Sequence, residues 1–438
     1  MYRIAIAGTG YVGLVTGVCL ASKGFPITCV DVNQDKIDML NRGECPIYEP
    51  GLREIMLQFR NNLTYTTDSQ SAYQNADVIF IGVGTPERRD GSANLDYVYT
   101  VADEIAEFVA HDCIIVLKST VPIGTNHQLI ERIKRHLKNP VNVEIASNPE
   151  FLSQGTAVKD TLQASRIIIG ADTPRAAKVL QEIYQHYGQP ILFTDICSAE
   201  MIKYASNDFL ALKISYINEI ANLCEITGAD VESVAQGMGM DPRIGNKFLK
   251  AGIGYGGSCF PKDTKALHWL ANFNDYEMKT IRAAIDVNEN QKLKLFKKSR
   301  KYYENLRERK VTALGLTFKP NTDDLRDAPS LQNIPLFTEL GAKVYAWDPV
   351  GEENFRKIVP DTIAYCSSIE EALKDSEICF IFTEWDAIKM FDVHKYSQLM
   401  KTPVILDGRN CYSLSQFKNE PVIYDSIGRK TICNYKFD

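Results

Sequence analysis

The sequence lacks a long apolar run, an excess of positive charge and any pairing of cysteines. No stretch is long enough to cross a bilayer, and the amino-terminal apolar run is strand-sized and interrupted by Arg3, so we expect neither a membrane span nor a signal peptide. The formal net charge of -6 gives no general attraction for nucleic acid or an anionic membrane. The 11 cysteines form no CxxC pair and no metal-like spacing with histidine. These absences predict a cytoplasmic protein with reduced thiols and no metal site.

The remaining composition is that of an ordinary soluble protein. Hydrophobic residues make up 45% of the chain and charged residues 24%. No internal repeat or low-complexity tract is present. The 438 residues are enough for two or three domains, each with its own core.

A glycine-rich turn follows the first apolar segment. Tyr2–Ala7 is typical of a buried strand, GTGYVG occupies 8–13, a helical pattern runs to Gly24, and a strand at 27–30 ends at Asp31. This order of strand, GxGxxG, helix, strand and acid predicts a dinucleotide-binding unit, with pyrophosphate at the helix start and Asp31 on the adenosine ribose. A carboxylate there repels a ribose phosphate, which favours NAD over NADP. The predicted contacts are Gly8, Gly10, Tyr11, Val12, Gly13, Asp31 and, along the adenosine side or facing solvent, Lys36.

Polar turns follow the next apolar strands at 78–83, 114–117 and 143–146. Ligands of open parallel sheets lie beyond the carboxyl ends of the strands. We therefore expect Thr85, Pro86, Ser119 and Thr120 to face the cofactor. Glu150 follows the third strand over the same crevice; the alternative is a solvated loop carboxylate.

A long helix is predicted from Ser198, which could cap its start, to Gly228, which could end it. Lys203 and Asn207 lie four residues apart and share one face. That pair is either functional or a solvated stripe. A second helical stretch at 280–303 carries a run of basic residues (297–301), which we interpret as a solvated helix end before a linker.

The segment GIGYGGSCFPKD at 252–263 combines a glycine-rich turn with the start of a helix. Pro261 suits the first helical turn, which places Cys259 at the helix N-terminus, where a thiolate is stabilised. Lys262 and Asp263 stand within one turn of it as a cation and a possible base. The alternative is a small buried cysteine in a tight turn. The agreement of glycines, helix start and charges favours a nucleophile.

A second α/β pattern begins at Val311, with strand-like runs at 311–314, 343–347, 378–382 and 404–406. It lacks GxGxxG, but Lys319, Arg326 and Arg409 offer cations to a phosphate ester. The predicted fold class is α/β: two doubly wound Rossmann-like domains joined by a helical central domain with a long helix. The predicted domains are 1–196, which binds NAD; 197–305, which is helical and carries the cysteine loop; and 306–438, the second α/β unit, which offers these cations.

Together these motifs resemble the UDP-glucose/GDP-mannose dehydrogenase family, whose members oxidise the alcohol of a nucleotide sugar fully to an acid. The resemblance rests on GTGYVG at 8–13, NPEFL at 148–152, Lys203 with Asn207, FLKAGIGYGGSCFPKD at 248–263, FKPNTDDLRDAPS at 318–330 and DGRN at 407–410. It implies NAD-dependent four-electron oxidation of UDP-glucose to UDP-glucuronate through an aldehyde and a thiohemiacetal and thioester on Cys259.

The resemblance also implies residue roles. Lys203, supported by Asn207, would stabilise the oxyanion; Asp263 would act as base or position water; Glu150 and Thr120 would manage protons and the hydrolytic water. Lys262 and Arg326 would lie on the cofactor side, and Arg243 would come from a second subunit of a homodimer. The resemblance thus assigns dimerisation to 197–305 and binding of the UDP-sugar to 306–438. The implied substrate contacts are Glu150, Phe151, Leu152, Gln154, Lys203, Asn207, Arg243, Phe248, Leu249, Lys250, Ala251, Gly252, Tyr255, Gly256, Lys319 and Arg409.

One position departs from the family pattern: Gln154 stands where many members carry a glutamate, so an acid/base role there is in doubt. GDP-mannose and UDP-N-acetylhexosamine dehydrogenases are rivals that share the cysteine chemistry. A two-electron β-hydroxyacid dehydrogenase shares the nucleotide domain and the Lys/Asn pair, but it needs neither Cys259 nor the second α/β unit. A non-enzymatic sensor would be expected to have lost one of Cys259, Lys203 or Asp263.

Overall fold

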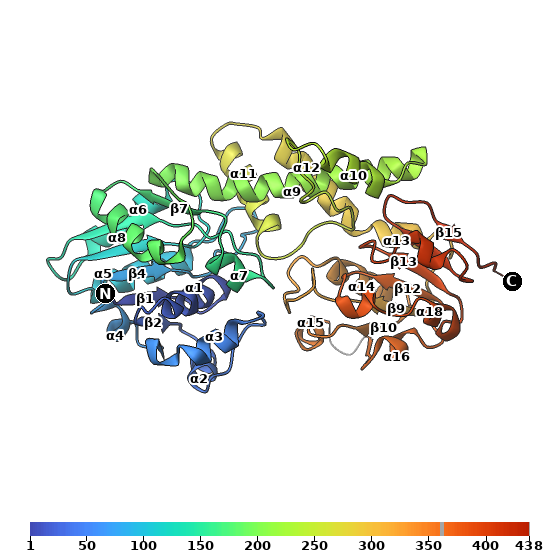
Figure 1. Ribbon diagram of the computed structural model, residues 1–438, viewed down its shortest axis with the longest axis horizontal. Helices are drawn as coiled ribbons and strands as arrows, with labels where there is room; N and C mark the ends of the chain where they lie inside the picture. Colours follow the sequence, from blue (N-terminus) through green and yellow to red (C-terminus); the bar gives the residue numbers. More distant parts are fainter. Residues whose placement is uncertain (360–362, 438) are drawn as a thin grey trace. The chain divides into compact units, whose positions relative to one another are not determined.

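The computed structural model describes residues 1–359 and 363–437, which form two compact units (Figure 1). The first unit is Met1–Ser206 with Trp269–Asn274, and the second is Asn207–His268 with Asp275–Asp438. One boundary falls inside α9 (Ile196–Thr227) and another inside α11 (Phe260–Phe273), and the third lies just after the end of α11. The division into three domains stays a prediction.

The first unit is built on one sheet of eight strands within residues 1–206, all of which are described. The strand order is β3-β2-β1-β4-β5-β6-β7-β8, and only the β6–β7 pair is antiparallel among these described strands. The strands are β1 (Ile4–Ala7), β2 (Ile27–Val30), β3 (Leu63–Thr66), β4 (Val78–Ile81), β5 (Cys113–Leu117), β6 (Val143–Ser147), β7 (Ile167–Ala171) and β8 (Ile191–Thr194).

Helices cover both faces of this sheet because its central strands are apolar on both sides. In β4, Ile79 and Ile81 pack with residues of α5 and α6, whereas Val78 and Phe80 pack with residues of α1 and α8. The helices are α1 (Tyr11–Ser22), α2 (Gln34–Asn41), α3 (Leu52–Gln58), α4 (Ser69–Tyr73), α5 (Asp96–Phe108), α6 (Thr125–His136), α7 (Ala157–Leu162) and α8 (Pro174–Tyr184).

The second unit contains a sheet of seven strands among its described residues, in the order β11-β10-β9-β12-β13-β14-β15. All described pairs are parallel except β14–β15. The strands are β9 (Lys310–Leu314), β10 (Lys343–Trp347), β11 (Ala364–Tyr365), β12 (Ile378–Ile381), β13 (Val404–Asp407), β14 (Ile423–Ser426) and β15 (Ile432–Cys433). The helices wholly within this unit are α10 (Val231–Gly239), α12 (Lys279–Lys292), α13 (Lys294–Ser299), α14 (Pro329–Glu339), α15 (Glu352–Ile358), α16 (Ile369–Leu373), α17 (Asp386–Lys389) and α18 (His394–Leu399).

The long helix α9 corrects one predicted cap. It begins at Ile196, two residues before Ser198, and the side chain of Asp195 accepts a hydrogen bond from the backbone N–H of Ser198 at 2.8 Å. Asp195 is therefore the capping residue. Gly228, at φ +82°, follows the last turn as predicted.

The basic run at 297–301 is also not simply a solvated helix end. Lys298 is buried, and its Nζ lies 2.8 Å from Glu225 Oε1 on α9 and 2.6 Å from Asp425 Oδ1 on β14. This ion cluster ties α13 to α9 and to the sheet within the second unit. Because Glu225 and Asp425 lie far from Lys298 in the sequence, the run of basic residues does not by itself indicate this ion cluster.

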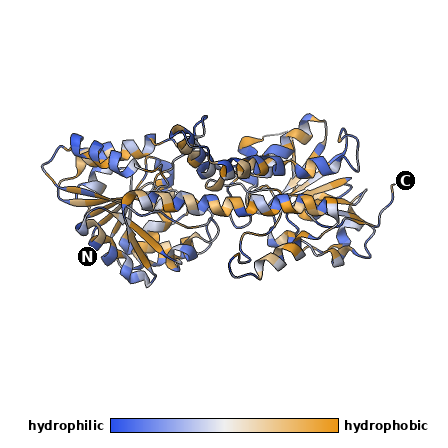
Figure 2. Ribbon diagram, turned by 90° about the horizontal axis from the view of Figure 1, so that it is seen from above, coloured by the Kyte–Doolittle hydropathy of each residue, from blue (hydrophilic) through white to orange (hydrophobic). Residues whose placement is uncertain are grey.

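The two parallel-dominated sheets and the 32-residue α9 confirm the predicted fold class. Figure 2 shows the strands of both sheets as mostly hydrophobic and the helices around them as mixed. Among the described helices, none is both long enough and apolar enough to cross a bilayer.

Candidate functional site

The turn after β1 has the geometry of a dinucleotide loop. A Cβ on Gly13 would stand 2.0 Å from the carbonyl oxygen of Gly8, so only glycine allows α1 to start this close to the strand. A Cβ on Gly10 would meet nothing within 4 Å. No side chain caps the start of α1, and its first turn holds no acidic residue. This helix N-terminus therefore suits a pyrophosphate.

Asp31, at the end of β2, closes the same turn. Its Oδ2 accepts from the backbone N–H of Thr9 at 2.8 Å and from Thr9 Oγ1 at 2.7 Å, and its Oδ1 accepts from Asn33 N–H at 3.0 Å. Partial burial acts to raise the pKa of Asp31, but these hydrogen bonds and the charge of Lys36 lower it overall. The carboxylate is therefore held ionised where the ribose hydroxyls of a dinucleotide would lie.

The sheet order places β1 between β2 and β4, which makes the β1–β4 edge a topological switch point. Beyond it, Thr85 Oγ1 donates to the carbonyl oxygen of Thr120 at 2.8 Å, and Ser119 Oγ donates to Val83 O at 2.6 Å. The predicted polar turns after β4 and β5, including Pro86, thus meet at one edge of the sheet. Together with the GxGxxG turn and Asp31 they fit NAD.

Glu150 and Lys203 form a buried ion pair in the first unit. Lys203 Nζ lies 2.9 Å from Glu150 Oε1, and the two side chains are only 3% and 5% exposed. Glu150 Oε2 accepts from Leu152 N–H at 2.8 Å, and the ring of Phe151 lies 5.4 Å from Lys203 Nζ. Glu150 is therefore not a solvated loop carboxylate. Gln154 is buried a few residues further along.

Cys259 immediately precedes α11 in the second unit. Its carbonyl oxygen accepts from Asp263 N–H at 2.8 Å, which is the first bond of the helix, and its thiol is partly exposed. Ser258 Oγ lies 3.7 Å from the sulfur. This confirms the predicted position of the cysteine at a helix N-terminus, with Pro261 in the first turn.

Asp263 is 1% exposed and held from two sides. Its Oδ1 accepts from Lys262 Nζ at 2.5 Å and its Oδ2 from Asn207 Nδ2 at 2.7 Å. Asn207, on α9, is thus buried against α11 and is not part of a solvated stripe, while its catalytic role stays a prediction.

The glycines before Cys259 are required by close packing within the second unit. A Cβ on Gly256 would lie 2.5 Å from the carbonyl oxygen of Asp327, and one on Gly257, at φ +84°, would lie 2.7 Å from the ring of Phe318. Gly257 N–H also donates to Arg326 O at 2.7 Å. The 318–327 segment therefore forms one wall of the cysteine loop.

Arg409 and Lys319 lie beyond the carboxyl ends of β13 and β9. The guanidinium of Arg409 donates to Phe382 O at 2.8 Å, Gly254 O at 2.9 Å and Phe318 O at 3.2 Å, which joins the sheet edge to the glycine loop. Lys319 Nζ lies 5.4 Å from the ring of Phe318. β9 neighbours both β10 and β12, so these cations stand at the switch point of the second sheet.

Comparison with known proteins gives the family. Residues 2–188 match the UDP-glucose/GDP-mannose dehydrogenase family, NAD binding domain; residues 197–290 match its central domain; and residues 312–414 match its UDP binding domain. The chain belongs to the UDP-glucose/GDP-mannose dehydrogenase family. It is thus an NAD-dependent oxidoreductase.

Individual members of the family match over nearly the whole chain. The UDP-glucose 6-dehydrogenase YwqF of Bacillus subtilis (strain 168) is 47% identical over 432 residues, which is 98% of each chain. A UDP-glucose dehydrogenase structure from Pyrobaculum islandicum has a TM-score of 0.92 at 35% identity and 98% coverage of both chains. A UDP-D-ManNAc dehydrogenase structure from Pyrococcus horikoshii has a TM-score of 0.86 at 26% identity, with 98% of this chain and 99% of that chain covered.

The structure assigns the predicted family residues to two groups. The cofactor turns, Glu150, Phe151, Leu152, Gln154 and Lys203 belong to the first unit. Asn207, Cys259, Lys262, Asp263 and the remaining substrate positions belong to the second.

The run at 248–252, which is predicted to contact the substrate, lies in the second unit, and three of its five residues are buried. Phe248 adopts φ +64° and its ring lies 6.2 Å from that of Phe260, while Leu249 and Ala251 are buried and Lys250 is exposed. The side chain of Arg243 is 88% exposed and pairs with Asp241 at 2.6 Å. Arg326 pairs with Asp324 at 2.7 Å.

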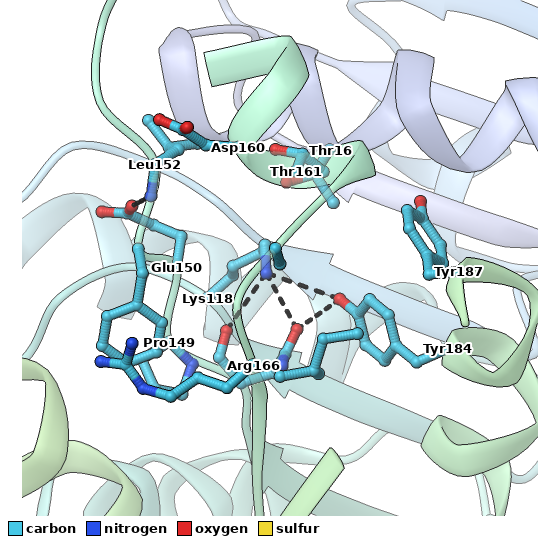
Figure 3. Close-up of a pocket in the computed structure, with 14 residues that line it drawn as sticks. Thr16, Lys118, Pro149, Glu150, Leu152, Asp160, Thr161, Arg166, Tyr184 and Tyr187 are labelled. Carbon is cyan, nitrogen blue, oxygen red and sulfur yellow. Dashed lines mark hydrogen bonds between the residues drawn. The ribbon is translucent and has the colours of Figure 1, made fainter. Parts of the chain in front are cut away.

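Lys118, which directly follows β5, is a buried residue of the first unit that was not among the predicted site residues. Its Nζ donates to Asn148 Oδ1 at 2.9 Å and approaches Tyr184 OH at 3.5 Å in a cavity of about 50 Å³ that Glu150 also lines (Figure 3). Burial lowers the pKa of Lys118 to about 8, although Glu150 acts to raise it. The sequence feature that could have indicated Lys118 is its position directly after an apolar strand.

Buried amides, also missed, hold the glycine loop. Gly252 N–H donates to Asn218 Oδ1 at 2.9 Å, and Gln291 Nε2 donates to Gly252 O at 2.7 Å. Asn288 accepts from Tyr255 N–H at 2.8 Å and donates to Tyr255 O at 3.0 Å. Asn288 and Gln291 continue the buried stripe of α12, so amides at positions of the apolar stripe could have indicated them.

Glu49, in the first unit, is a buried carboxylate that was also missed. It accepts hydrogen bonds from Gly155 N–H and Ala157 N–H, and no local sequence pattern marks it.

Proposed function

We propose that this enzyme is a UDP-glucose 6-dehydrogenase that oxidises UDP-glucose to UDP-glucuronate. The observation that carries the proposal is the position of Cys259 at the N-terminus of α11, one turn from Asp263. The glycine loop before Cys259 is held by Arg409, which donates to the carbonyl oxygen of Gly254. A two-electron oxidation needs no nucleophile, whereas oxidation of an aldehyde to an acid does. The 47% identical relative named UDP-glucose 6-dehydrogenase supports the choice of sugar nucleotide.

In the first oxidation the primary alcohol of the sugar gives up a hydride and its hydroxyl proton and becomes an aldehyde; we assign the acceptance of that proton to Glu150 and Thr120. NAD, when bound by the GxGxxG turn and Asp31, supplies a hydride acceptor, and two molecules in succession take up four electrons. Lys203 places a buried positive charge for the oxygen that becomes negative, and Glu150, 2.9 Å away, fixes the position of that ammonium. We assign Thr120, together with Glu150, to the positions that handle this proton and hold the hydrolytic water.

In the second oxidation the sulfur of Cys259 bonds to the aldehyde carbon, and the oxygen gains a proton to give a thiohemiacetal. Loss of a second hydride and of the hydroxyl proton leaves a thioester. Water then attacks the thioester carbon, Asp263 accepts the proton of that water, and the carbon–sulfur bond breaks to return the thiolate. Asn207 and Lys262 hold Asp263 in place for this step.

The nucleotide half of the substrate is assigned to the glycine loop and the second sheet. Lys319 and Arg409 supply positive charge to the diphosphate. The backbone of the 248–256 run, clamped by Asn218, Asn288 and Gln291, supplies rigid walls. The buried Gln154 keeps hydrogen-bonding capacity without a charge, so no acid/base step is assigned to it.

Stoichiometry tests this proposal. We expect two NADH and one UDP-glucuronate for each UDP-glucose, and we expect Cys259→Ser to bind both ligands while losing orders of magnitude in turnover. GDP-mannose and UDP-N-acetylmannosamine, assayed in parallel, should react far more slowly. One NADH per sugar, or parental turnover by Cys259→Ser, would refute the thioester route; faster oxidation of another sugar nucleotide would refute the substrate.

We further propose a homodimer in which Arg243 completes the site of the partner. The exposed side chain of Arg243 supports this, as does an exposed apolar stripe along α9 in the second unit: Phe209, Tyr216, Leu223 and Ile226. Mixing Arg243→Ala with Cys259→Ser tests it. Randomly mixed dimers should recover about a quarter of parental activity if Arg243 acts across the interface, and none if it acts within its own chain.

We infer that the enzyme works in a reducing compartment. All 11 cysteines, each within the described residues, are free thiols, which supports a cytoplasmic location. No group of three or more His, Cys, Asp or Glu side chains in the described part of the chain could hold a metal ion.

A further inference from the structure

Asp208 is a buried carboxyl group to which the proposed mechanism gives no role. It follows Asn207 on α9 and is 2% exposed. Among the described residues, neither of its carboxyl oxygens has a hydrogen-bond partner. An ionised carboxylate in such a position is costly, because no protein donor compensates its charge.

Of the charged groups that face Asp208, Asp263 opposes its ionisation and Lys262 favours it. Asp263 and Lys262 act on it from α11, and the buried phenol of Tyr255 lies near it from the glycine loop. Both oxygens of Asp263 are occupied by Lys262 and Asn207. The cluster therefore holds two carboxyl groups and one ammonium, and that ammonium is already committed to Asp263.

The titration of Asp208 agrees with this arrangement. Burial, together with the neighbouring Asp263, raises the pKa of Asp208 to about 8, while Lys262 acts to lower it. Below that pH the group is neutral. As the pH rises through this value it loses its proton and gains a negative charge.

We propose that Asp208 is a positioning residue that keeps its proton during turnover and so leaves Asp263 as the one negative charge of this cluster. The inference rests on the proposed function in taking Asp263 as the group that receives a proton from the hydrolytic water. An ionised Asp208 would add a second negative charge beside Asp263, compete for Lys262 and disfavour the anions that form at Cys259 and on the substrate oxygen. Turnover therefore falls when Asp208 loses its proton.

The test is the pH profile of kcat, measured as NADH formation and normalised to the maximum of each variant. For a single ionisation near 8, the parent at about pH 9 should retain about a tenth of its maximum. Asp208→Asn is isosteric and neutral at every pH, so it should stay near its own maximum at that pH, a difference of about tenfold. Asp286→Asn, on the exposed side of α12 in the same unit, is the matched control and should keep the parental profile.

An alkaline limb that is the same in Asp208→Asn as in the parent would overturn the inference. Asp208→Thr, a small neutral replacement, gives the same test if the asparagine variant does not fold. A parent with no alkaline loss near pH 9 would overturn the inference without any variant.

The profile is measured on whichever sugar nucleotide the parent oxidises, with NADH counted separately. Failure of the proposed function then shows as a different preferred sugar or as one NADH per substrate. Failure of the role of Asp208 shows as an unmoved alkaline limb.

Discussion

The buried pair of Glu150 and Lys203 gives a prediction whose size follows from the structure. Replacing Glu150 with Gln removes a carboxylate 2.9 Å from an ammonium that is 3% exposed, in a region where Lys118 adds a second buried amine. Removing one partner of a buried pair costs about 3–5 kcal/mol. The amide oxygen of glutamine can still accept a hydrogen bond, so we expect the lower end of this range.

The first unit, of about 210 residues, should change its melting temperature by about 2–4 °C for each kcal/mol. A loss of about 3 kcal/mol therefore predicts a decrease of about 6–12 °C for Glu150→Gln. The matched control is Asp77→Asn in the same unit, whose partner Arg3 lies 3.0 Å away but whose side chains are 55% (Arg3) and 30% (Asp77) exposed. Water screens an ion pair this exposed, which therefore contributes little to stability, so this variant should lose less than about 4 °C.

Scanning calorimetry measures both variants, and the transition of the first unit is the one that NAD shifts upward. Circular dichroism at low temperature checks that both variants fold. If Glu150→Gln melted within about 2 °C of Asp77→Asn, the pair would not stabilise the unit as its burial indicates. Retention of parental kcat by Glu150→Gln would in addition remove Glu150 from the mechanism.

Three further expectations concern the thiol, the cofactor and the glycine turn. Brief iodoacetamide treatment near neutral pH should label Cys259 first, because a helix N-terminus stabilises its thiolate, whereas burial raises the pKa of Cys19 to about 12 and also raises that of Cys197. Labelling spread evenly over Cys19, Cys197 and Cys259 in mass spectrometry would contradict this. Asp31→Asn should narrow the preference for NAD over NADP, measured as the ratio of kcat/KM values, and equal use of both by the parent would refute the assignment. Gly13→Ala should unfold the turn and abolish NAD binding in calorimetry because its Cβ would lie 2.0 Å from a carbonyl oxygen, whereas Gly10→Ala should melt like the parent.

Local patterns in the sequence determined much of the fold. The spacing of GxGxxG and Asp31 predicted a turn that the structure closes with a hydrogen bond from Thr9, because strand, turn and helix are neighbours along the chain. The start of α11 after Cys259 followed in the same way from glycines and a proline. The length of α9 followed from apolar periodicity, while its cap moved from Ser198 to Asp195, since competing capping residues a few positions apart look alike in sequence.

Only the tertiary structure decided which charged and amide side chains are buried, and against what. Lys298 belongs to an exposed-looking basic run, yet it meets Asp425 from 127 residues away. Lys118 donates a hydrogen bond to Asn148, 30 residues away, and Asn288 accepts one from the backbone of Tyr255, 33 residues away. In the sequence Asp208 is an ordinary aspartate of a predicted helix, and only the packing of α11 against it shows that it is buried. Burial sets the cost of a charge and the value of a hydrogen bond, and burial at these positions is created by segments that no local pattern brings together.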